Sequence, residues 1–553
     1  MLLPVTTHPS RLSVKAQPLP PNSVVWGKQG EGEALKRSQQ LAWASAFRSQ
    51  LQAFDYEITE IEGVLPEELK GSTLFRNGPS RFERGDQRVA HYLDGDGYIA
   101  KIAFAPDGRV TFSSRFVKTA EYAWEDAANA FGFRTTFGNA KPGGFLASLL
   151  DLHLKNPANT HVVPWGSRLL ALYEAGMPYR IDPYTLETLG VEDLLGQLVE
   201  PVLPPSRWEM MMRRSRGQQA MTAHPHVDPV RDRLVTWSWG MAAKLGEPNT
   251  LIIELIEYNA AWEEMSRRQY SMPGAAVNPH DFALTPNYYV FFENALSFDV
   301  MPFLLGQKSP ADCLKLLPKP TKVHLIPRPD GAMAGVGPLV LETDQWFSIH
   351  QACAYEQLDG QPDGQVVVYS SGWPASEGGF LTSWGGYAPN FDAIAPTFLW
   401  QTTLNPRKKS VVHRIAPGTE NCCIAHPHVN PNRETLAVRY LYMPYCNNIG
   451  ESSPPVGYLR LDTQTQQRQV WTMHPQSFAE EPVFVPRAGG RADGENEDDG
   501  WLLGVTYDYL QDRSSLMLFD AADIEAGPIC RLWFTHHLAH GLHGSWSPVY
   551  YGS

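Results

Sequence analysis

The sequence lacks the features that mark several common classes of protein. No run of apolar residues approaches the ~20 residues that a membrane-spanning helix needs. No basic stripe with interleaved aromatic residues is present, and the formal net charge is -13 at pH 7, so nucleic acid is not expected as a partner. The 6 cysteines form no Cys-x-x-Cys pair, which argues against a zinc ribbon or a disulfide framework. They predict buried, reduced thiols in a reducing compartment, and we expect a cytoplasmic protein.

The N-terminal region also lacks acidic side chains over its first thirty residues, and it has no signal-peptide apolar core. We expect residues 1–40 to be a flexible tail; plastid targeting stays open. Residues 41–54 carry a helical apolar stripe of Trp43, Phe47, Leu51 and Phe54. It predicts a helix that docks on the main body, with a membrane-surface helix as the alternative.

From about residue 56 onward, short apolar runs alternate with turn residues, which predicts many short strands. Each four-stranded blade of a propeller takes roughly 40–50 residues, so the 553 residues favour a propeller over a sandwich or a barrel. The expected strands include residues 97–104, 110–117, 168–173, 233–239, 288–293, 365–369, 435–443, 457–461 and 501–507. We expect one all-β domain over residues 41–553.

Two stretches stand out from this strand pattern. Residues 143–154 are strongly apolar and include Phe145, Leu149 and Leu150, which predicts a core helix or an interfacial segment that opens a path for a lipid-soluble substrate. The second feature is an internal echo, Ala-His-Pro-His-Val-Asp-Pro at 223–229 and Ala-His-Pro-His-Val-Asn-Pro at 425–431. The echo reflects equivalent positions in two blades or coincidence.

Four histidines in short, distinctive contexts carry the chemical hypothesis: His224, His280, His350 and His543. A lone histidine usually serves packing or the surface, so the argument depends on the four contexts together. Four imidazoles without a thiolate or carboxylate ligand suit a borderline divalent metal such as iron, copper or zinc. A structural zinc site would show close ligand pairs, and these are missing. A closed, symmetric scaffold is needed to bring such distant residues to one ion.

Two glutamates are candidates for holding these imidazoles in place. Metal-binding histidines usually donate their other N–H to a carboxylate, which fixes the tautomer. Glu174 follows an apolar strand segment, and Glu481 precedes another. Four ligands on an octahedral ion would leave two adjacent positions for dioxygen and substrate.

The chain resembles the carotenoid cleavage oxygenase family, most closely the cyanobacterial apocarotenoid oxygenases. The resemblance runs from about residue 41 to the C-terminus, and it rests on the four histidine contexts and on several further motifs. These motifs lie at residues 75–79, 94–97, 154–160, 170–174, 481–487 and 497–503. The resemblance implies a seven-bladed β-propeller with a helical and loop cap over one face, and Fe²⁺ held by the four histidines on its axis.

The resemblance also implies roles for individual residues. Glu174 and Glu481 match two carboxylates that support the ligands, and Thr160 matches a threonine whose methyl group restricts binding at an open iron position. His224, rather than His226, matches the first ligand. For the substrate tunnel or its entrance we expect a further set of residues, which are Phe145, Leu149, Leu150, Tyr173 and Ile349.

One departure from the family pattern concerns its Glu-Phe-Pro motif. Aligned on the proline, this sequence carries Ala425 in place of the glutamate, followed by His426. Either His426 or His428 replaces the carboxylate as a hydrogen-bond partner, or one ligand, which we expect to be His350, is held less firmly. The loss of such a partner typically costs ~10–100-fold in metal affinity or activity.

The predicted activity is cleavage of a double bond of a carotenoid or apocarotenoid with O2, which gives two carbonyl products. An apolar polyene and O2 are the expected partners, and peripheral contact with a membrane is an open expectation. A stilbene-cleaving dioxygenase of the same family ranks second, with Tyr122 as a phenol-binding residue, although Phe133 stands where a lysine is expected. A retinoid isomerase, a zinc hydrolase and a propeller binding protein with a vestigial metal site rank lower.

Overall fold

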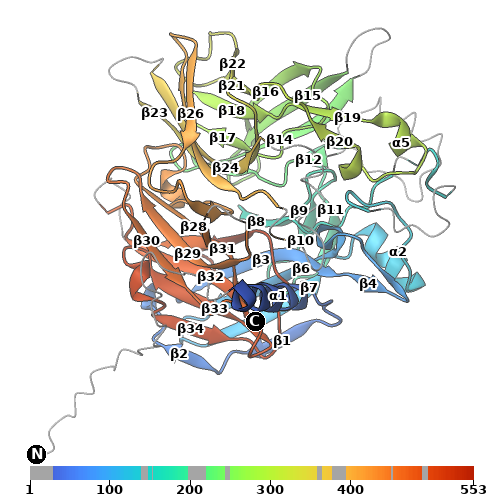
Figure 1. Ribbon diagram of the computed structural model, residues 1–553, viewed down its shortest axis with the longest axis vertical. Coiled ribbons are helices and arrows are strands. Elements are labelled where there is room, and N and C mark those ends of the chain that lie inside the picture. The colour runs from blue at the N-terminus through green and yellow to red at the C-terminus, as the bar shows by residue number, and fades with distance from the viewer. Residues whose placement is uncertain are drawn as a thin grey trace, which may run out of the picture.

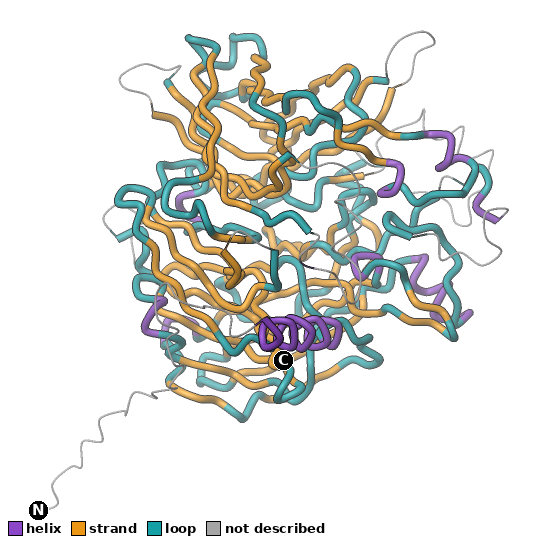
Figure 2. Tube along the Cα trace, in the orientation of Figure 1, coloured by secondary structure: helices purple, strands orange, loops and turns teal. Residues whose placement is uncertain are grey.

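The computed structural model describes residues 29–138, 147–151, 153–196, 198, 220–242, 249–357, 364–375, 391, 394–449, 452–487 and 496–552. Seven antiparallel sheets of four or five strands follow one another around a ring (Figure 1), and strands dominate the chain trace (Figure 2). The prediction of a seven-bladed β-propeller is confirmed.

The strands of the seven sheets are as follows. The first sheet holds β1 (Phe54–Glu57), β7 (Val110–Phe116), β6 (Asp96–Phe104), β3 (Ser72–Arg81) and β35 (Gly544–Ser547). The second holds β11 (Thr188–Val191), β10 (Tyr179–Ile181), β9 (Arg168–Leu172) and β8 (His161–Trp165). The third holds β12 (Ala220–Met221), β13 (His226–Asp228), β14 (Arg233–Ala242), β15 (Thr250–Tyr258) and β16 (Glu264–Pro273). The fourth holds β17 (Phe282–Leu284), β18 (Tyr288–Glu293), β21 (Lys322–Pro327) and β22 (Leu339–Glu342); the fifth holds β23 (Trp346–Gln357), β24 (Gln365–Pro374), β25 (Phe398–Asn405) and β26 (Ser410–Ile415). The sixth holds β27 (Cys422–Ile424), β28 (Tyr440–Ile449), β29 (Pro455–Asp462) and β30 (Arg468–Thr472); the seventh holds β2 (Ile61–Gly63), β34 (Cys530–Trp533), β33 (Arg513–Asp520), β32 (Gly500–Asp508) and β31 (Ser477–Pro486).

Smaller elements lie outside the seven sheets in the part of the chain that the structure describes. Two antiparallel two-stranded sheets pair β4 (Glu83–Arg84) with β5 (Gln87–Arg88) and β19 (Leu296–Phe298) with β20 (Leu314–Leu316); the described helices include α1 (Gln29–Ser45), α2 (Ala120–Ala128) and α5 (Val300–Leu304). Short 3-10 turns are η1 (Glu67–Leu69), η2 (Tyr92–Asp94), η3 (Ala311–Cys313), η5 (Pro431–Arg433) and η6 (Ile524–Ala526).

Strands from the two ends of the described chain close the ring. The N-terminal strand β2 pairs with β34 in the seventh sheet, and the C-terminal strand β35 pairs with β3 in the first sheet. In Figure 1 the blue β2 therefore lies beside the red β34. Because each of these two sheets contains strands from both ends, separating the ends would break hydrogen bonds in both sheets.

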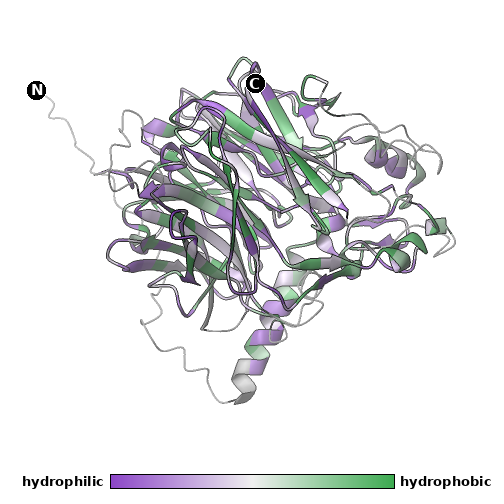
Figure 3. Ribbon diagram, turned by 90° about the horizontal axis from the view of Figure 1, so that it is seen from above, coloured by the Kyte–Doolittle hydropathy of each residue, from purple (hydrophilic) through white to green (hydrophobic). Residues whose placement is uncertain are grey.

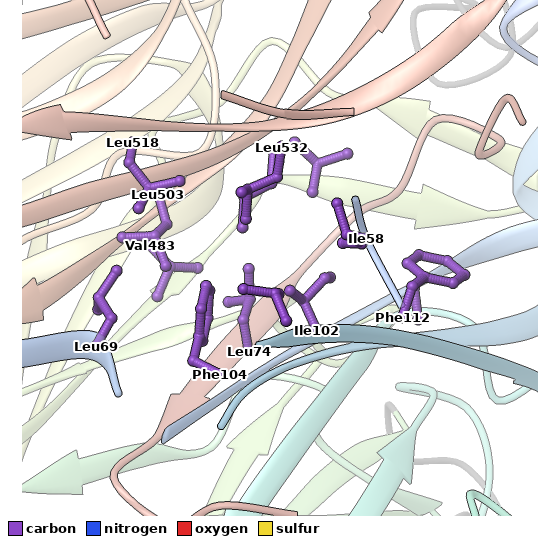
Figure 4. Close-up of a cluster of buried hydrophobic side chains, with 14 of the residues drawn as sticks. Ile58, Leu69, Leu74, Ile102, Phe104, Phe112, Val483, Leu503, Leu518 and Leu532 are labelled. Carbon is purple, nitrogen blue, oxygen red and sulfur yellow. The ribbon is translucent and has the colours of Figure 1, made fainter. Parts of the chain in front are cut away.

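A buried apolar cluster lies between each pair of neighbouring sheets, so the core is a ring of layers. Figure 4 shows the layer that joins the first and seventh sheets, where Leu74 and Ile102 face Leu503 and Leu532. All nine residues of β6 are buried, since neighbouring sheets cover both of its faces. Hydrophobic stretches accordingly run along the strands in Figure 3.

The helix predicted within residues 41–54 lies elsewhere in part. Helix α1 begins at Gln29 and ends at Ser45, so it occupies part of the expected flexible tail, whereas Phe54 lies in strand β1 and Leu51 is exposed. Trp43 and Phe47 are buried and pack in a cluster with Phe478 and Tyr507. The end of α1 therefore docks on the propeller, which agrees with the first of the two interpretations of this segment.

Of the two interpretations of residues 143–154, the structure bears on the core helix: residues 147 and 148 are helical, and the helix ends before Leu150. The alternative of an interfacial segment stays a prediction. Leu150 has φ 55, in the left-handed region, which ends a right-handed helix, and its side chain is exposed. Leu149 is only half-buried. A core helix therefore does not include Leu150; Phe145 and the rest of residues 143–146 lie outside the described residues.

Candidate metal centre

One edge strand of every sheet begins, breaks or bulges at a histidine or a glutamate. These seven residues, one per sheet, are His543 (before β35), His161 (at the start of β8), His224 (between β12 and β13), His280 (before β17), His350 (in β23), His426 (after β27) and Glu481 (in β31). The register of β23 shifts at His350, and that of β31 shifts around Glu481. A propeller places all such edges around one axis, which explains how distant residues meet.

The four predicted ligands lie together. The Nε2 atoms of His224 and His280 are 3.0 Å apart, and those of His280 and His350 are 3.3 Å apart. The ring centroid of His543 lies 4.7 Å from that of His224 and 5.0 Å from that of His350. Nitrogen atoms of His224, His280 and His350 all lie within 4.8 Å of one another, as metal ligands would.

A fifth imidazole, that of His426, stands in the same cluster. Its ring centroid is 4.7 Å from that of His350 and 5.0 Å from that of His543. His350, His426 and His543 form a second group whose nitrogens lie within 4.8 Å of one another. The sequence predicted His426 as a hydrogen-bond partner of a ligand; the structure places its ring beside the ligand rings, and no hydrogen bond between His426 and His350 is present.

Two carboxylates hold outer ring nitrogens of the cluster. Nδ1 of His280 pairs with the carboxylate of Glu174, and Nδ1 of His543 lies 2.9 Å from Oε1 of Glu481. Such partners fix the tautomer and orientation of a ligand, so the remaining nitrogen is presented to the metal. Both glutamates therefore contact ligands, as the sequence predicted; that Glu174 holds His280 and Glu481 holds His543 comes from the structure.

The ionisation of His224 and His350 favours metal binding. Burial, reinforced by the neighbouring imidazoles, lowers the pKa of His224 and His350 well below the ordinary value. Burial opposes the charged form of His280, but the Glu174 carboxylate outweighs this and raises the His280 pKa. Neutral imidazole is the form that binds a metal, so His224 and His350 need no deprotonation.

A buried arginine, which sequence reasoning did not single out, supports Glu481. The guanidinium of Arg76 lies 2.8 Å from Glu480 and 3.4 Å from Glu481. Burial works to raise the pKa of Glu481, but His543 and Arg76 outweigh it and hold that pKa well below its usual range. The sequence offers one sign of this buried arginine: it directly follows the apolar residues Leu74 and Phe75 within a strand segment.

Other histidines near the cluster already have partners. His226 lies 3.0 Å from Asp281 and 2.6 Å from Glu434, and these carboxylates outweigh burial and raise its pKa to about 10. His161 contacts the carbonyl oxygen of Ala223 through Nδ1 and the hydroxyl of Ser545 through Nε2. Neither ring has a nitrogen left for a metal.

A cavity of about 420 Å³ opens on the cluster. Of the residues predicted for the tunnel or the iron position, Thr160, Tyr173 and Ile349 line it, as does Ala425. Leu149 and Leu150 are not among the residues that line the cavity. Leu150 is exposed, and its N–H donates to the carbonyl of Leu304, 2.8 Å away. The apolar lining includes the rings of Trp43, Trp239, Phe298, Phe347, Trp373 and Phe391.

The donor set fits a borderline divalent ion. Two groups of three imidazoles, which share His350, converge without a thiolate, and carboxylates bind outer nitrogens of two of these rings. The cluster lies at the wall of a mostly apolar cavity, where a bound ion would face a nonpolar ligand. This arrangement can activate a small molecule such as O2 beside a substrate that offers little to hydrogen-bond.

Replacing Glu174 with glutamine is expected to weaken binding of a divalent metal ion by about 10–100-fold, because His280 would lose the anionic acceptor that orients it. The measurement is a competition titration against a chelator. Glu187→Gln is the matched control, since Glu187 is exposed beside β11 of the same sheet and should leave the affinity unchanged. Equal affinities for wild type and Glu174→Gln would contradict the assigned role.

Comparisons with known proteins agree with this geometry. A profile of the family described as retinal pigment epithelial membrane protein matches residues 47–548. The apocarotenoid-15,15'-oxygenase of Synechocystis is 33% identical over 91% of this chain and 96% of its own length. Carotenoid cleavage dioxygenase 7 of Oryza sativa is 27% identical (90% of each chain), and resveratrol cleavage oxygenase 1 of Aspergillus fumigatus is 26% identical (89% and 92%). The crystal structure of cobalt-substituted Synechocystis ACO superposes with a TM-score of 0.80 at 34% identity, over 92% of this chain and 98% of that one.

Proposed function

Because this chain belongs to the retinal pigment epithelial membrane protein family, whose relatives include carotenoid and apocarotenoid oxygenases, we propose that it is a non-haem Fe²⁺ dioxygenase acting on an apocarotenoid. In the proposed reaction one C=C bond breaks, and each of its carbons receives one oxygen atom of O2 as a carbonyl. The equation balances without a reductant. The observation that carries the proposal is the convergence of His224, His280, His350 and His543 on one wall of an apolar cavity.

Iron is the metal that we assign to this cluster. When bound, Fe²⁺ would supply the activation of O2. Neutral imidazole donors leave such an ion its full positive charge and suit iron in its divalent state. The carboxylates of Glu174 and Glu481 bind outer ring nitrogens, so we assign them the role of orienting His280 and His543; Glu174 also lines the cavity.

The cavity positions the substrate. A polyene has almost no hydrogen-bonding groups, so shape and length select the bond that is cleaved. Aromatic rings such as Phe347 and Trp373 provide an apolar wall, and Ile349 lines it directly before the ligand His350. Thr160 lines the same cavity and its hydroxyl bonds to Asn159 Oδ1 at 3.3 Å; we assign it the role of limiting space beside the ion.

A stilbene is the second candidate substrate, and the surroundings of Tyr122 speak against it. This residue lies in α2, stacks on Phe116 with ring centroids 5.4 Å apart, and does not line the cavity. Phe133 contacts Trp124 and His153 instead of the cavity. Neither Tyr122 nor Phe133 therefore faces the cavity, and no lysine is among the described residues that line it.

The test is a comparison of three substrates with the iron-loaded enzyme in air. We expect an apocarotenal to be cleaved, an intact carotenoid to be cleaved more slowly, and a resveratrol-type stilbene not to be cleaved. Preferential cleavage of the stilbene would overturn the substrate assignment but not the reaction class. Absence of turnover with all three, in protein that holds iron, would overturn the enzyme proposal in favour of a binding protein.

We also propose that an exposed apolar patch beside the cavity contacts a membrane surface. Leu150 is 51% exposed and Met301 of α5 is 59% exposed, and α5 follows the cavity-lining Phe298 within two residues. Apolar residues on such a surface bind the interfacial region of lipids. No helix among the described residues is long and apolar enough to span a bilayer.

The double variant Leu150→Glu, Met301→Glu should release the protein from phosphatidylcholine vesicles in a flotation assay, because two charges replace the largest apolar groups of the patch. Val412→Glu with Leu510→Glu serves as the matched control, since both residues are exposed, Val412 in β26 and Leu510 in the turn between β32 and β33. Unchanged flotation of the patch variant would refute the membrane contact.

A further inference from the structure

The internal echo in the sequence corresponds to an equivalence in the fold. In the third sheet, β12 and β13 both pair with β14, and the edge strand breaks between them at His224. In the sixth sheet, β27 and the bridging residue His428 both pair with β28, and the edge strand breaks between them at His426. Ala-His-Pro-His-Val therefore builds the same interrupted edge in two sheets, and His426 takes the place that His224 takes in its own sheet.

The equivalence extends to the metal cluster. Two imidazole nitrogens bound to one ion at about 2.1 Å can be at most about 4.2 Å apart. Nitrogens that already lie within 4.8 Å of each other therefore need to move only slightly closer together to bind one ion. His426 meets this condition with both His350 and His543. His224 meets it with His280 and His350, so the two echoed histidines flank His350 from different sheets.

The ring of His426 is also available. Neither of its nitrogens has a hydrogen-bond partner among the described residues, and the residue lines the cavity. His161, which also lies beside His543, differs because both of its nitrogens are occupied. The backbone of His426 has φ 36, a left-handed conformation that is costly for a residue other than glycine. Such strain is usually maintained where it serves a site.

We propose that His426 is a fifth ligand of the metal ion, bound directly rather than through a neighbouring histidine. The inference rests on the proposed function, because it takes the ion to be held by His224, His280, His350 and His543. It changes the expected chemistry of the centre: five imidazoles leave a six-coordinate ion one exchangeable position instead of two. It also accounts for Ala425, since a histidine ligand in this segment makes a supporting carboxylate for His350 unnecessary.

The experiment uses Co²⁺ as the probe, because its visible absorption reports coordination number. Co²⁺ is titrated into metal-free wild-type protein, His426→Ala, His426→Gln and the matched control His428→Ala. We expect the His426 variants to bind Co²⁺ on the order of tenfold or more weakly, which is the least that a supporting residue contributes. Their absorption should differ from that of wild type, and added imidazole should restore the wild-type spectrum in His426→Ala. His428→Ala should match wild type in all three respects.

The outcomes separate this inference from the proposed function. Wild-type protein that binds no Co²⁺ would overturn the metal centre as a whole. Weaker binding by His426→Ala with an unchanged spectrum and no response to imidazole would show that His426 only positions His350, and would overturn the ligand assignment alone. His426→Gln keeps a polar side chain of similar size, so it provides the same comparison if His426→Ala fails to fold, as judged by near-UV circular dichroism.

Discussion

Replacing His543 with alanine is expected to abolish iron binding and O2-dependent cleavage. His543 is buried, its ring centroid lies 4.7 Å from that of His224, and Nδ1 is held by Glu481 at 2.9 Å. The variant removes a ligand and leaves Oε1 of Glu481 without its His543 partner. We expect a loss of metal affinity larger than the about 10–100-fold that supporting residues contribute. Iron content per chain, after gel filtration, is the measurement.

His540→Ala is the matched control for this variant. His540 lies three residues earlier, is also buried, and packs against Trp43 with ring centroids 4.8 Å apart. Its removal costs packing energy but no ligand, so stability should fall while iron content stays at the wild-type level. If His543→Ala retained one iron per chain, the assignment of His543 would be wrong. It would also be wrong if His540→Ala lost as much iron as His543→Ala.

Replacing Arg76 with methionine is expected to destabilise the protein by about 3–5 kcal/mol, because it leaves buried carboxylates without their cation. Arg76 is 1% exposed and pairs with both Glu480 and Glu481. The same change should weaken iron binding, since Glu481 without Arg76 holds His543 less firmly. The stability effect is measured as the shift in the denaturant midpoint, and the second effect by chelator competition.

Two comparisons test the cause of this effect. Arg115→Met removes an arginine whose partner, Asp55, is largely exposed, so it should cost no more than about 1 kcal/mol. The double variant Arg76→Met, Glu480→Met should regain part of the lost stability. It removes Glu480 together with Arg76, so one buried carboxylate fewer is left without a cation. A cost for Arg76→Met as small as that of Arg115→Met would contradict the structural role of the ion pairs.

The fold was largely predictable because its strands are short, regular and bounded by turn residues. The expected strand at 288–293 coincides with β18, and 97–104 differs from β6 by one residue. The strand expected at 435–443 begins only at Tyr440, since the turn η5 and a bend precede it. Helix α1 was missed before residue 41 because the polar residues 29–40 carry no apolar stripe. Gln39, whose amide donates to the carbonyl of Pro475, joins this segment to the propeller through a contact that sequence spacing does not show.

The site was predictable to the extent that each histidine had a recognisable sequence context. The position of Arg76 was not, because its carboxylate partners lie more than four hundred residues away. The tunnel residues Leu149 and Leu150 were assigned by hydrophobicity alone, and neither lines the cavity. Hydrophobicity does not tell which apolar residues of the chain face a cavity. For His426 the sequence contained the decisive sign, the echo of 223–229 at 425–431, but only the strand pairing shows that both copies occupy equivalent edges.

The most direct test of the account is the mass of the products formed by iron-loaded protein from one apocarotenal under O2 and under N2. The account predicts two carbonyl products under O2, whose masses sum to that of the substrate plus O2, and no products under N2. It also predicts that both products disappear in His543→Ala and persist in His540→Ala. An oxygen-independent product, or a single oxygenated product with the carbon chain intact, would contradict the assignment of this chain as a cleavage dioxygenase.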